Sequence, residues 1–192
     1  VEGINLAQLR TDLLHSGTRP SFSQGDLNHA IGHLIANLRG FLEANGTLLG
    51  DWALHNLVFV TGAKRIVNVD AKEFCSGLHT TDFKVDDLNM IVANFDDLTQ
   101  LMTLSASSGE KDSETKGVLR VLDEVRRSGE SYSGVYFLAG YHSLNLRGSR
   151  FRGQRECSQR LSIVPFDFRD KVVIDLGCNC GGMLHALSGI IK

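Results

Sequence analysis

The chain has 192 residues, of which 42% are hydrophobic and 22% charged, and its formal net charge at pH 7 is −2. This composition is ordinary for a globular protein of one large or two small domains. The small net charge excludes a global field that would recruit nucleic acid or an anionic membrane. No apolar run reaches the roughly 18 to 20 residues that span a bilayer, and the opening Val-Glu-Gly begins no signal-peptide pattern. We therefore expect a cytoplasmic protein whose first residue lies inside a longer polypeptide.

The cysteine and histidine spacings favour reduced thiols over disulfides or a zinc site. No repeated Cys-x-x-Cys pattern occurs among the cysteines, which are Cys75, Cys157, Cys178 and Cys180. His29 and His33 lie four residues apart, so on a helix they could share one face and bind a metal. Solvated or helix-capping histidines are the simpler interpretation, because the sequence shows no further ligand.

The first helix signal begins at Asp26, the predicted N-cap, and ends at Asn45-Gly46. Between these points, apolar residues recur at spacings of three and four, which predicts one face turned toward a core. The residues of this face are Leu27, Ile31, Leu34, Ile35, Leu38, Phe41 and Leu42.

The next segment predicts a loop followed by a β-hairpin. Asp51 precedes Asn56 by five positions, and Asn56 leads into an apolar strand. Residues 61–64 form the predicted turn, and the second strand returns over 65–70 and ends in Asp70. Asp and Asn are common in turns, so a plain polar loop feeding a hairpin is an open alternative.

The spacing Asp51-x4-Asn56 followed by Asp70 resembles the catalytic core of the protein-kinase-like phosphotransferases, in particular the loop of aminoglycoside- and lipopolysaccharide-kinase-type enzymes. The resemblance implies that Asp51 orients the attacking hydroxyl, while Asn56 and Asp70 hold Mg²⁺ on the phosphates of ATP. The sequence Asp70-Ala71-Lys72 departs from the Asp-Phe-Gly of many kinases. The lysine that binds the phosphates in these enzymes, and their glycine-rich loop, would lie upstream of Val1.

Residues 82–104 predict a second long helix, whose carboxylates Asp86, Asp87, Asp96 and Asp97 are expected on solvated faces. The segment 105–114 is small and polar, so we expect a mobile linker there and place the domain boundary in it.

A helix is predicted over 118–127, and aromatic residues then cluster up to Tyr141 and His142. They are followed by an arginine row: Arg147, Arg150, Arg152, Arg155 and Arg160. Such a row could grip nucleic acid or a phosphorylated ligand. The small net charge favours the alternative, a lead-in to a sheet domain with the arginines facing water.

The last segment predicts a strand, a glycine turn and a helix. Residues 171–174 suit a buried parallel strand that Asp175 closes, and residues 183–187 open a helix. This arrangement brings backbone close to a nucleotide-like ligand. Asn179, in the middle of the turn, tolerates the left-handed conformation. An ordinary strand-turn-helix and an NAD site are the open alternatives.

The spacing Asp175-x-Gly177-x-Asn179-x-Gly181 resembles motif I of the class I S-adenosylmethionine-dependent methyltransferases. The resemblance implies a pocket for S-adenosylmethionine shaped by Asp175, Gly177, Cys178, Asn179 and Gly181. The run from Tyr141 to Leu161 resembles the segment before motif I in bacterial methyltransferases of this bifunctional type. That second resemblance implies that Gln154 and Arg155 approach the cofactor.

Together these patterns predict an α/β protein. Residues 1–104 would form a mostly helical kinase-like C-lobe with a short β-hairpin, 105–115 a linker, and 116–192 the beginning of a Rossmann-like methyltransferase domain. The expected function is methyl transfer from S-adenosylmethionine to a small-molecule or glycan-type acceptor, joined to phosphotransfer from ATP with Mg²⁺. We expect the chain to be a piece of a bifunctional bacterial enzyme that alone shows neither full activity. A kinase-like part that serves only as a scaffold, or a module that binds RNA or a phosphorylated ligand through Arg147–Arg160, are the alternatives.

Overall fold

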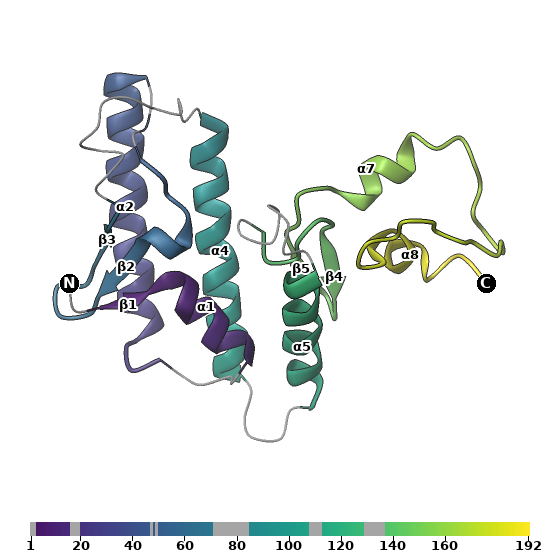
Figure 1. Cartoon of the computed structure of the whole chain (residues 1–192), viewed down its shortest axis with the longest axis horizontal. Helices are drawn as coiled ribbons and strands as arrows, with labels where there is room; N and C mark the ends of the chain where they lie inside the picture. The colour runs from purple at the N-terminus through teal and green to yellow at the C-terminus, as the bar shows by residue number, and fades with distance from the viewer. Residues whose placement is uncertain are drawn as a thin grey trace. The chain divides into compact units, whose positions relative to one another are not determined.

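The structure is a computed structural model that describes residues 3–15, 20–46, 48, 50–70, 85–107, 113–128 and 137–192. The chain divides into two compact units, Val1–Lys116 and Gly117–Lys192, and each is described by itself (Figure 1). Both units combine helices with a small antiparallel sheet, so the expected α/β class is confirmed at this coarse level. Within the described ranges, no helix is both long enough and apolar enough to cross a membrane.

The first unit is built on an antiparallel sheet with the strand order β1-β2-β3. The strands are β1 (Ile4–Asn5), β2 (Leu57–Val60) and β3 (Arg65–Asn68). Leu57 pairs with Asn68 in the register of β2 and β3. Leu57 and Phe59 are fully buried, as expected for a strand that turns alternate side chains to a core. The predicted hairpin is therefore confirmed, although its second strand ends at Asn68 and not at Asp70.

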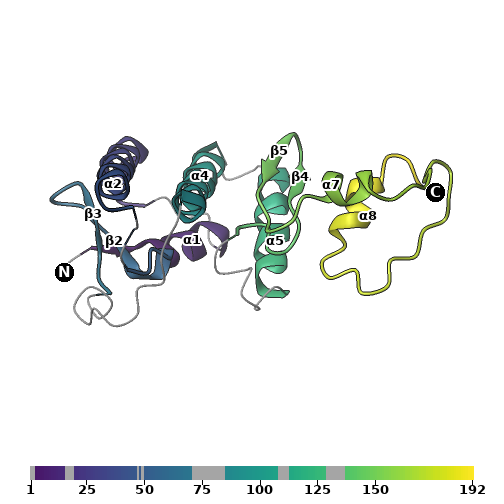
Figure 2. The same ribbon diagram turned by 90° about the horizontal axis from the view of Figure 1, so that it is seen from above.

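The helices α1 (Leu6–His15), α2 (Gln24–Asn45) and α4 (Val85–Ser107) pack around this sheet. α2 and α4 lie side by side in both views, and α2 also contacts β3 (Figures 1 and 2). α1 contacts α4, β2 and the short 3₁₀ helix η1 (Leu54–Asn56). The core between these elements includes the fully buried side chains of Leu6, Leu13, Leu27, Phe59, Phe95 and Leu98.

α2 begins earlier than the sequence predicts. Its N-cap is Ser23, whose Oγ accepts a hydrogen bond from the Asp26 N–H at 3.0 Å. Asp26 therefore lies in the first turn, where a negative charge favours the helix dipole. The predicted end is confirmed, because Gly46 has a φ of +75° and its N–H donates to the Leu42 carbonyl at 2.7 Å.

α4 corrects the expected linker and one expected surface residue. The helix continues to Ser107 and α5 (Ser113–Ser128) begins soon after, so both ends of the expected 105–115 linker are helical. Ser105 is 2% exposed and Asp97 is 7% exposed, so Asp97 does not lie on a solvated face. Both side chains follow the helical period of the buried Leu98 and Leu101, which carries them inward. Cys75, residues 82–84 and residues 108–112 lie outside the described residues.

The second unit contains α5, the hairpin strands β4 (Leu144–Leu146) and β5 (Ser149–Phe151), and the short helices α7 (Cys157–Ser162) and α8 (Gly182–Leu187). α5 and α8 confirm the two helices predicted for this region. The hairpin was not predicted from the sequence. Its turn places Arg147 and Gly148 at φ values of +52° and +79°, the left-handed conformations that a tight two-residue hairpin turn requires.

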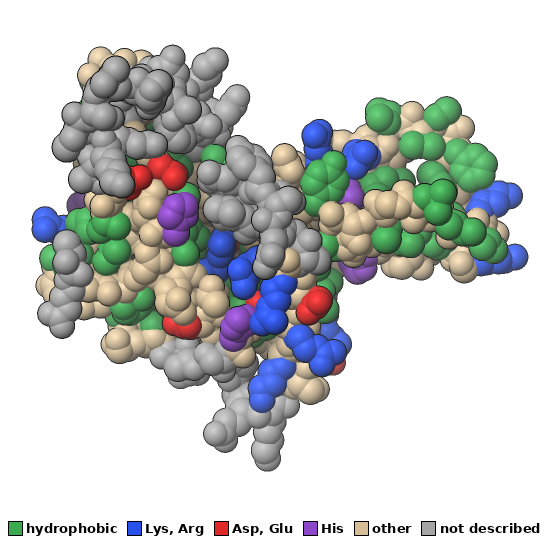
Figure 3. Space-filling model, viewed as in Figure 1, with side chains coloured by type: hydrophobic (Ala, Val, Ile, Leu, Met, Phe, Trp, Pro, Cys, Tyr) green, Lys and Arg blue, Asp and Glu red, His purple; other side chains and the backbone are tan. Residues whose placement is uncertain are grey.

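Residues 171–175, predicted as a buried parallel strand, form no strand. Val172, Ile174 and Leu176 are 79%, 80% and 90% exposed. Figure 3 shows hydrophobic side chains gathered on the surface of this part of the second unit. The physical reason is that a parallel strand needs a neighbouring strand for its backbone hydrogen bonds, and none of the described segments supplies one. The expectation of a strand is therefore corrected, while the turn that follows it is present.

Candidate functional site

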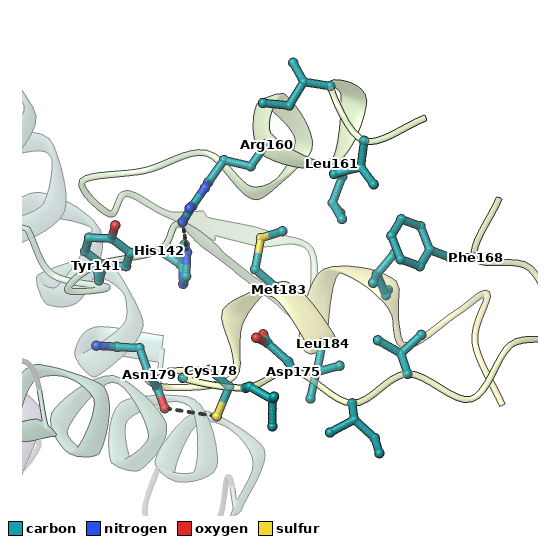
Figure 4. A pocket seen from close by; sticks show the side chains of 17 residues that line it. Tyr141, His142, Arg160, Leu161, Phe168, Asp175, Cys178, Asn179, Met183 and Leu184 are labelled. Atoms are coloured by element: carbon teal, nitrogen blue, oxygen red, sulfur yellow. Dashed lines mark hydrogen bonds between the residues drawn. The ribbon is translucent and has the colours of Figure 1, made fainter. Parts of the chain in front are cut away.

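A cavity of about 520 Å³ lies in the second unit beside the glycine turn (Figure 4). Tyr141, His142 and Arg160 supply polar groups on one side, and Asp175 supplies a carboxylate near the centre of the view. Most of the remaining wall is apolar and includes Leu161, Ile163, Val164, Phe168, Val173, Ile174, Leu176, Met183, Leu184 and Leu187. A largely apolar cavity with a few convergent polar groups is the usual form of a small-molecule site.

The glycine turn is held by alternate residues in the left-handed conformation. Gly177, Asn179 and Gly181 have φ values of +76°, +52° and +72°. Asn179 adopts this conformation as the sequence suggests, and its Oδ1 accepts a hydrogen bond from the Cys180 N–H at 2.8 Å. Gly181 directly precedes α8 and caps it. The turn therefore presents backbone, with few side chains, along this edge of the cavity.

The structure brings four of the predicted cofactor residues to the cavity and leaves the other three outside it. Asp175, Gly177, Cys178 and Asn179 line the wall, whereas Gly181 shapes the turn behind it. The Gln154 N–H donates to the Gly140 carbonyl at 3.0 Å, and the Arg155 N–H donates to the Tyr141 carbonyl at 2.9 Å. The side chains of Gln154 and Arg155 are exposed and line no part of the cavity. Their backbone supports the segment that carries Tyr141 and His142.

His142 lines the cavity but was not predicted as a site residue. Its side chain is 6% exposed, and Arg160 Nη1 lies 3.3 Å from its Nε2. Because a guanidinium can only donate, Nε2 must accept, so the ring proton resides on Nδ1. Nδ1 is buried and makes no hydrogen bond in the described structure. A buried donor without an acceptor costs about 1–3 kcal/mol, so the position of this ring carries a cost in stability.

Two glycines make room for His142. A Cβ on Gly182 would lie 2.6 Å from the His142 Cβ and 3.0 Å from its Nδ1. A Cβ on Gly153 would lie 2.2 Å from the His142 carbonyl carbon and 2.5 Å from the Ser143 nitrogen. All four distances are shorter than van der Waals contact, so only glycine fits at these two positions. Gly182 thus holds the imidazole against the beginning of α8, and Gly153 holds its backbone.

Burial, helped by the charge of Arg160, keeps His142 neutral. Burial lowers the pKa of the imidazole, and the positive charge of Arg160 lowers this pKa further. The carboxylate of Asp175 opposes both effects by favouring the protonated ring. The lowered pKa leaves His142 uncharged at neutral pH, as a hydrogen-bond donor through Nδ1.

The first unit holds the second group of predicted site residues at the ends of the hairpin. The Asp51 carbonyl accepts a hydrogen bond from Asn56 Nδ2 at 3.3 Å and another from Asn68 Nδ2 at 2.8 Å. Asp51 Oδ1 accepts from the Ala53 N–H at 2.9 Å, which closes a tight turn. Asp51 and Asn56 are therefore fixed relative to each other by local geometry.

Asn68 connects this loop to Asp70. Its Oδ1 accepts a hydrogen bond from the Asp70 N–H at 2.9 Å while its Nδ2 holds the Asp51 carbonyl. The pairing of Leu57 with Asn68 aligns the start of β2 with the end of β3, and the Val69 N–H donates to the Asn56 carbonyl at 2.9 Å, so the segments that carry Asn56 and Asp70 lie next to each other. His55 Nε2 lies 3.8 Å from Asp51 Oδ2. Asn68 was not predicted as a site residue. Its position two residues before Asp70, a predicted metal ligand, could have predicted a side-chain hydrogen bond to the Asp70 N–H.

The arginines of the row make separate local contacts. Arg150 pairs with the Glu156 carboxylate, Arg152 stacks over the Phe137 ring at 5.9 Å from its centroid, and Arg160 contacts His142. Arg147 occupies the hairpin turn. These positions assign separate local contacts to the arginines, so no observation favours a nucleic-acid interface over the small-molecule cavity.

Comparison of the chain with protein-family models, with curated proteins and with solved structures finds no match. The two family resemblances therefore rest on their sequence motifs alone.

Proposed function

We propose that the second unit binds S-adenosylmethionine at the glycine turn, as part of a methyltransferase domain. The observation that carries this proposal is the position of the turn. Gly177 and Asn179, both in the left-handed conformation, line a cavity whose other wall carries His142 and Arg160. Backbone in this conformation leaves room for a ligand that a Cβ would obstruct.

The polar groups of the cavity suit a ligand that carries both acceptors and donors. The Arg160 guanidinium offers donors, and Asp175 offers an acceptor (Figure 4). The apolar wall suits the less polar parts of such a ligand. Methyl transfer needs chiefly the alignment of donor and acceptor, and the small-molecule or glycan-type acceptor would complete that arrangement.

The direct test is binding of S-adenosylhomocysteine, the demethylated form of the cofactor, measured by calorimetry and by amide shifts of the labelled chain. We expect saturable binding, with the largest shifts at Asp175–Gly182 and at His142. Asp175→Ala should weaken binding at least about tenfold, because it removes a charged hydrogen-bond acceptor. Asp167→Ala is the matched control, since Asp167 is exposed and pairs only locally with Arg169. Shifts confined to other segments, or equal affinity in both variants, would reject the proposal.

A specific observation also favours a second candidate function, phosphotransfer in the first unit. Asn68 ties Asp51 to Asp70 through the two hydrogen bonds described above. In this proposal Asp51 orients a substrate hydroxyl, while Asn56 and Asp70 hold the Mg²⁺ that accompanies ATP.

The residues present fit such a cation. Asn56 Nδ2 is engaged by the Asp51 carbonyl, which leaves its amide oxygen as the group to offer a metal, and Asp70 adds a carboxylate. Oxygen ligands of this kind suit Mg²⁺. Mg²⁺ would neutralise phosphate charge, and the chain's own contribution is to orient the hydroxyl and fix the two loops. The described residues hold no cluster of three or more His, Cys, Asp or Glu side chains, so the phosphates and water would complete the coordination.

Substitution of Mn²⁺ for Mg²⁺ tests this second function without turnover. Paramagnetic Mn²⁺ with ATP should broaden the amide signals of Asn56 and Asp70 before others, and Asp70→Asn should abolish the effect. Arg65→Ala, on the exposed start of β3, is the control. Uniform broadening across both units would contradict the assignment.

A further inference from the structure

The outer face of α2 carries two histidines whose ring nitrogens converge. His29 Nε2 and His33 Nε2 lie 3.1 Å apart, and the rings meet edge-on with an interplanar angle of 80°. Both side chains are exposed. Without a bound ion, one imidazole donates a hydrogen bond to the other.

The helix holds this pair in place by contacts on its opposite face. Leu27 and Ala30 are buried at 0% and 2% exposure. Gln24 Nε2 donates to Thr103 Oγ1 of α4 at 2.9 Å, and Thr99 Oγ1 of α4 donates to Asn28 Oδ1 at 3.3 Å. The backbone that carries the histidines is therefore ordered before any ligand arrives, so binding need not organise it.

The separation of the two nitrogens fits chelation of one metal ion. Nitrogen ligands of Zn²⁺ lie about 2.0–2.1 Å from the metal, so nitrogens 3.1 Å apart subtend an angle of about 100° at that ion. This angle lies between the tetrahedral and square-planar values. Imidazole nitrogen suits Zn²⁺, Ni²⁺ and Cu²⁺.

We propose that His29 and His33 form a bidentate binding site for a divalent transition-metal ion. The neighbouring carboxylate on this face, Asp26, is held by Lys64 Nζ at 2.9 Å. No third His, Cys, Asp or Glu in the described ranges joins the pair in a metal-binding group. The remaining coordination positions therefore belong to water or to a ligand from outside the chain. The proposed site uses nitrogen ligands and is distinct from the proposed Mg²⁺ site, whose ligands are the oxygen atoms of Asn56 and Asp70.

Titration with Ni²⁺ alone tests the site in the full chain after its reactive thiols are alkylated, which removes Cys178 and Cys180 as competing ligands. We expect one saturable Ni²⁺ site and selective broadening of α2 amide signals around His29–His33. His29→Ala and His33→Ala should each weaken Ni²⁺ binding at least about tenfold, because each removes the chelate. His15→Ala, at the end of α1, should bind like the wild type.

Because the helix is formed only in the folded chain, Ni²⁺ should also raise the midpoint of thermal unfolding in the wild type and in His15→Ala. This shift should disappear in both single variants at α2. Absence of saturable binding, or equal affinity in His29→Ala and the wild type, would overturn the proposal. Broadening centred on residues 178–180 in the untreated chain and lost on alkylation would assign the ion to the thiols and would also overturn it.

Discussion

Substitution of Gly182 by alanine tests the packing of His142 against the glycine turn. The new Cβ would lie 2.6 Å from the His142 Cβ and 2.9 Å from its Cγ. Overpacking of this kind costs about 1–3 kcal/mol. Alanine recovers up to about 1 kcal/mol of helix propensity at the start of α8, so the expected net loss in the free energy of unfolding is about 1–2 kcal/mol.

Two further glycines calibrate the measurement. A Cβ on Gly189 meets nothing within 4 Å, so Gly189→Ala should change the stability by less than about 0.5 kcal/mol. Gly153→Ala should cost more than about 3 kcal/mol, because its Cβ would meet backbone atoms of His142 that cannot rotate away. Urea unfolding followed by circular dichroism, with hydrogen exchange of the β4–β5 amides to locate the effect, measures all three variants.

A double-mutant cycle separates the imidazole from the backbone. His142→Ala removes the Cγ and Nδ1 contacts, so it should reduce the cost of Gly182→Ala by about 1 kcal/mol. It should leave the cost of Gly153→Ala unchanged, since that clash is with backbone. Two results would refute the packing of the His142 imidazole against Gly182: equal stability of Gly182→Ala and Gly189→Ala, or equal coupling energies in the two cycles.

Three other changes follow from the structure. Burial lowers the pKa of His142 in the folded chain below the value of about 6.5 in the unfolded chain. The contribution of His142 to the free energy of unfolding should therefore be complete above about pH 6.5 and be lost as the pH falls through the folded pKa. This pH dependence should vanish in His142→Gln. Burial also raises the pKa of the Cys157 thiol, so iodoacetamide at pH 8 should label Cys178 and Cys180 well before Cys157. Equal labelling of the three thiols, measured by mass spectrometry, would contradict this prediction. Asn68→Ala breaks two hydrogen bonds and should cost about 1–3 kcal/mol in urea unfolding; a loss below 0.5 kcal/mol would contradict its bridging role.

The sequence predicted the elements that carry strong local signals. The 3.6-residue period marks α2 and α4, and the apolar run with a polar turn marks the β2–β3 hairpin. Element ends were less accurate. Ser23 and Asp26 are both good capping residues three positions apart, and only the hydrogen bond from the Asp26 N–H to Ser23 Oγ selects between them.

The errors arose where contacts decide the structure. Ser105 is polar, but the period of α4 carries it inward, so composition alone mistook a helix end for a linker. The β4–β5 turn was missed because Arg147, and not Asn or Asp, precedes Gly148 in the left-handed conformation. The strand predicted at 171–175 has the right residues but no paired neighbour in the described structure.

The candidate sites were predicted unevenly for the same reason. Spacing and residue type predicted the glycine turn and the hairpin between Asn56 and Asp70. His142 and Asn68 were not predicted, because their importance lies in contacts with residues distant in sequence, such as Arg160 and Asp51. The arrangement of His29 and His33 could be predicted in part. Their helical spacing places both residues on one face, but the side-chain rotamers bring the two Nε2 atoms to 3.1 Å.

The exposed apolar residues of the last segment have a practical consequence for handling the polypeptide. Val172, Ile174 and Leu176 alternate along the chain and are strongly exposed, and an exposed apolar segment of this kind tends to associate with copies of itself. The charges of Lys171, before these residues, and of Asp175, between Ile174 and Leu176, limit this tendency. We expect the isolated chain to precipitate with rising concentration, and light scattering should show that Ile174→Lys delays it while Arg169→Ala does not. Purification of this polypeptide therefore calls for dilute conditions from the start.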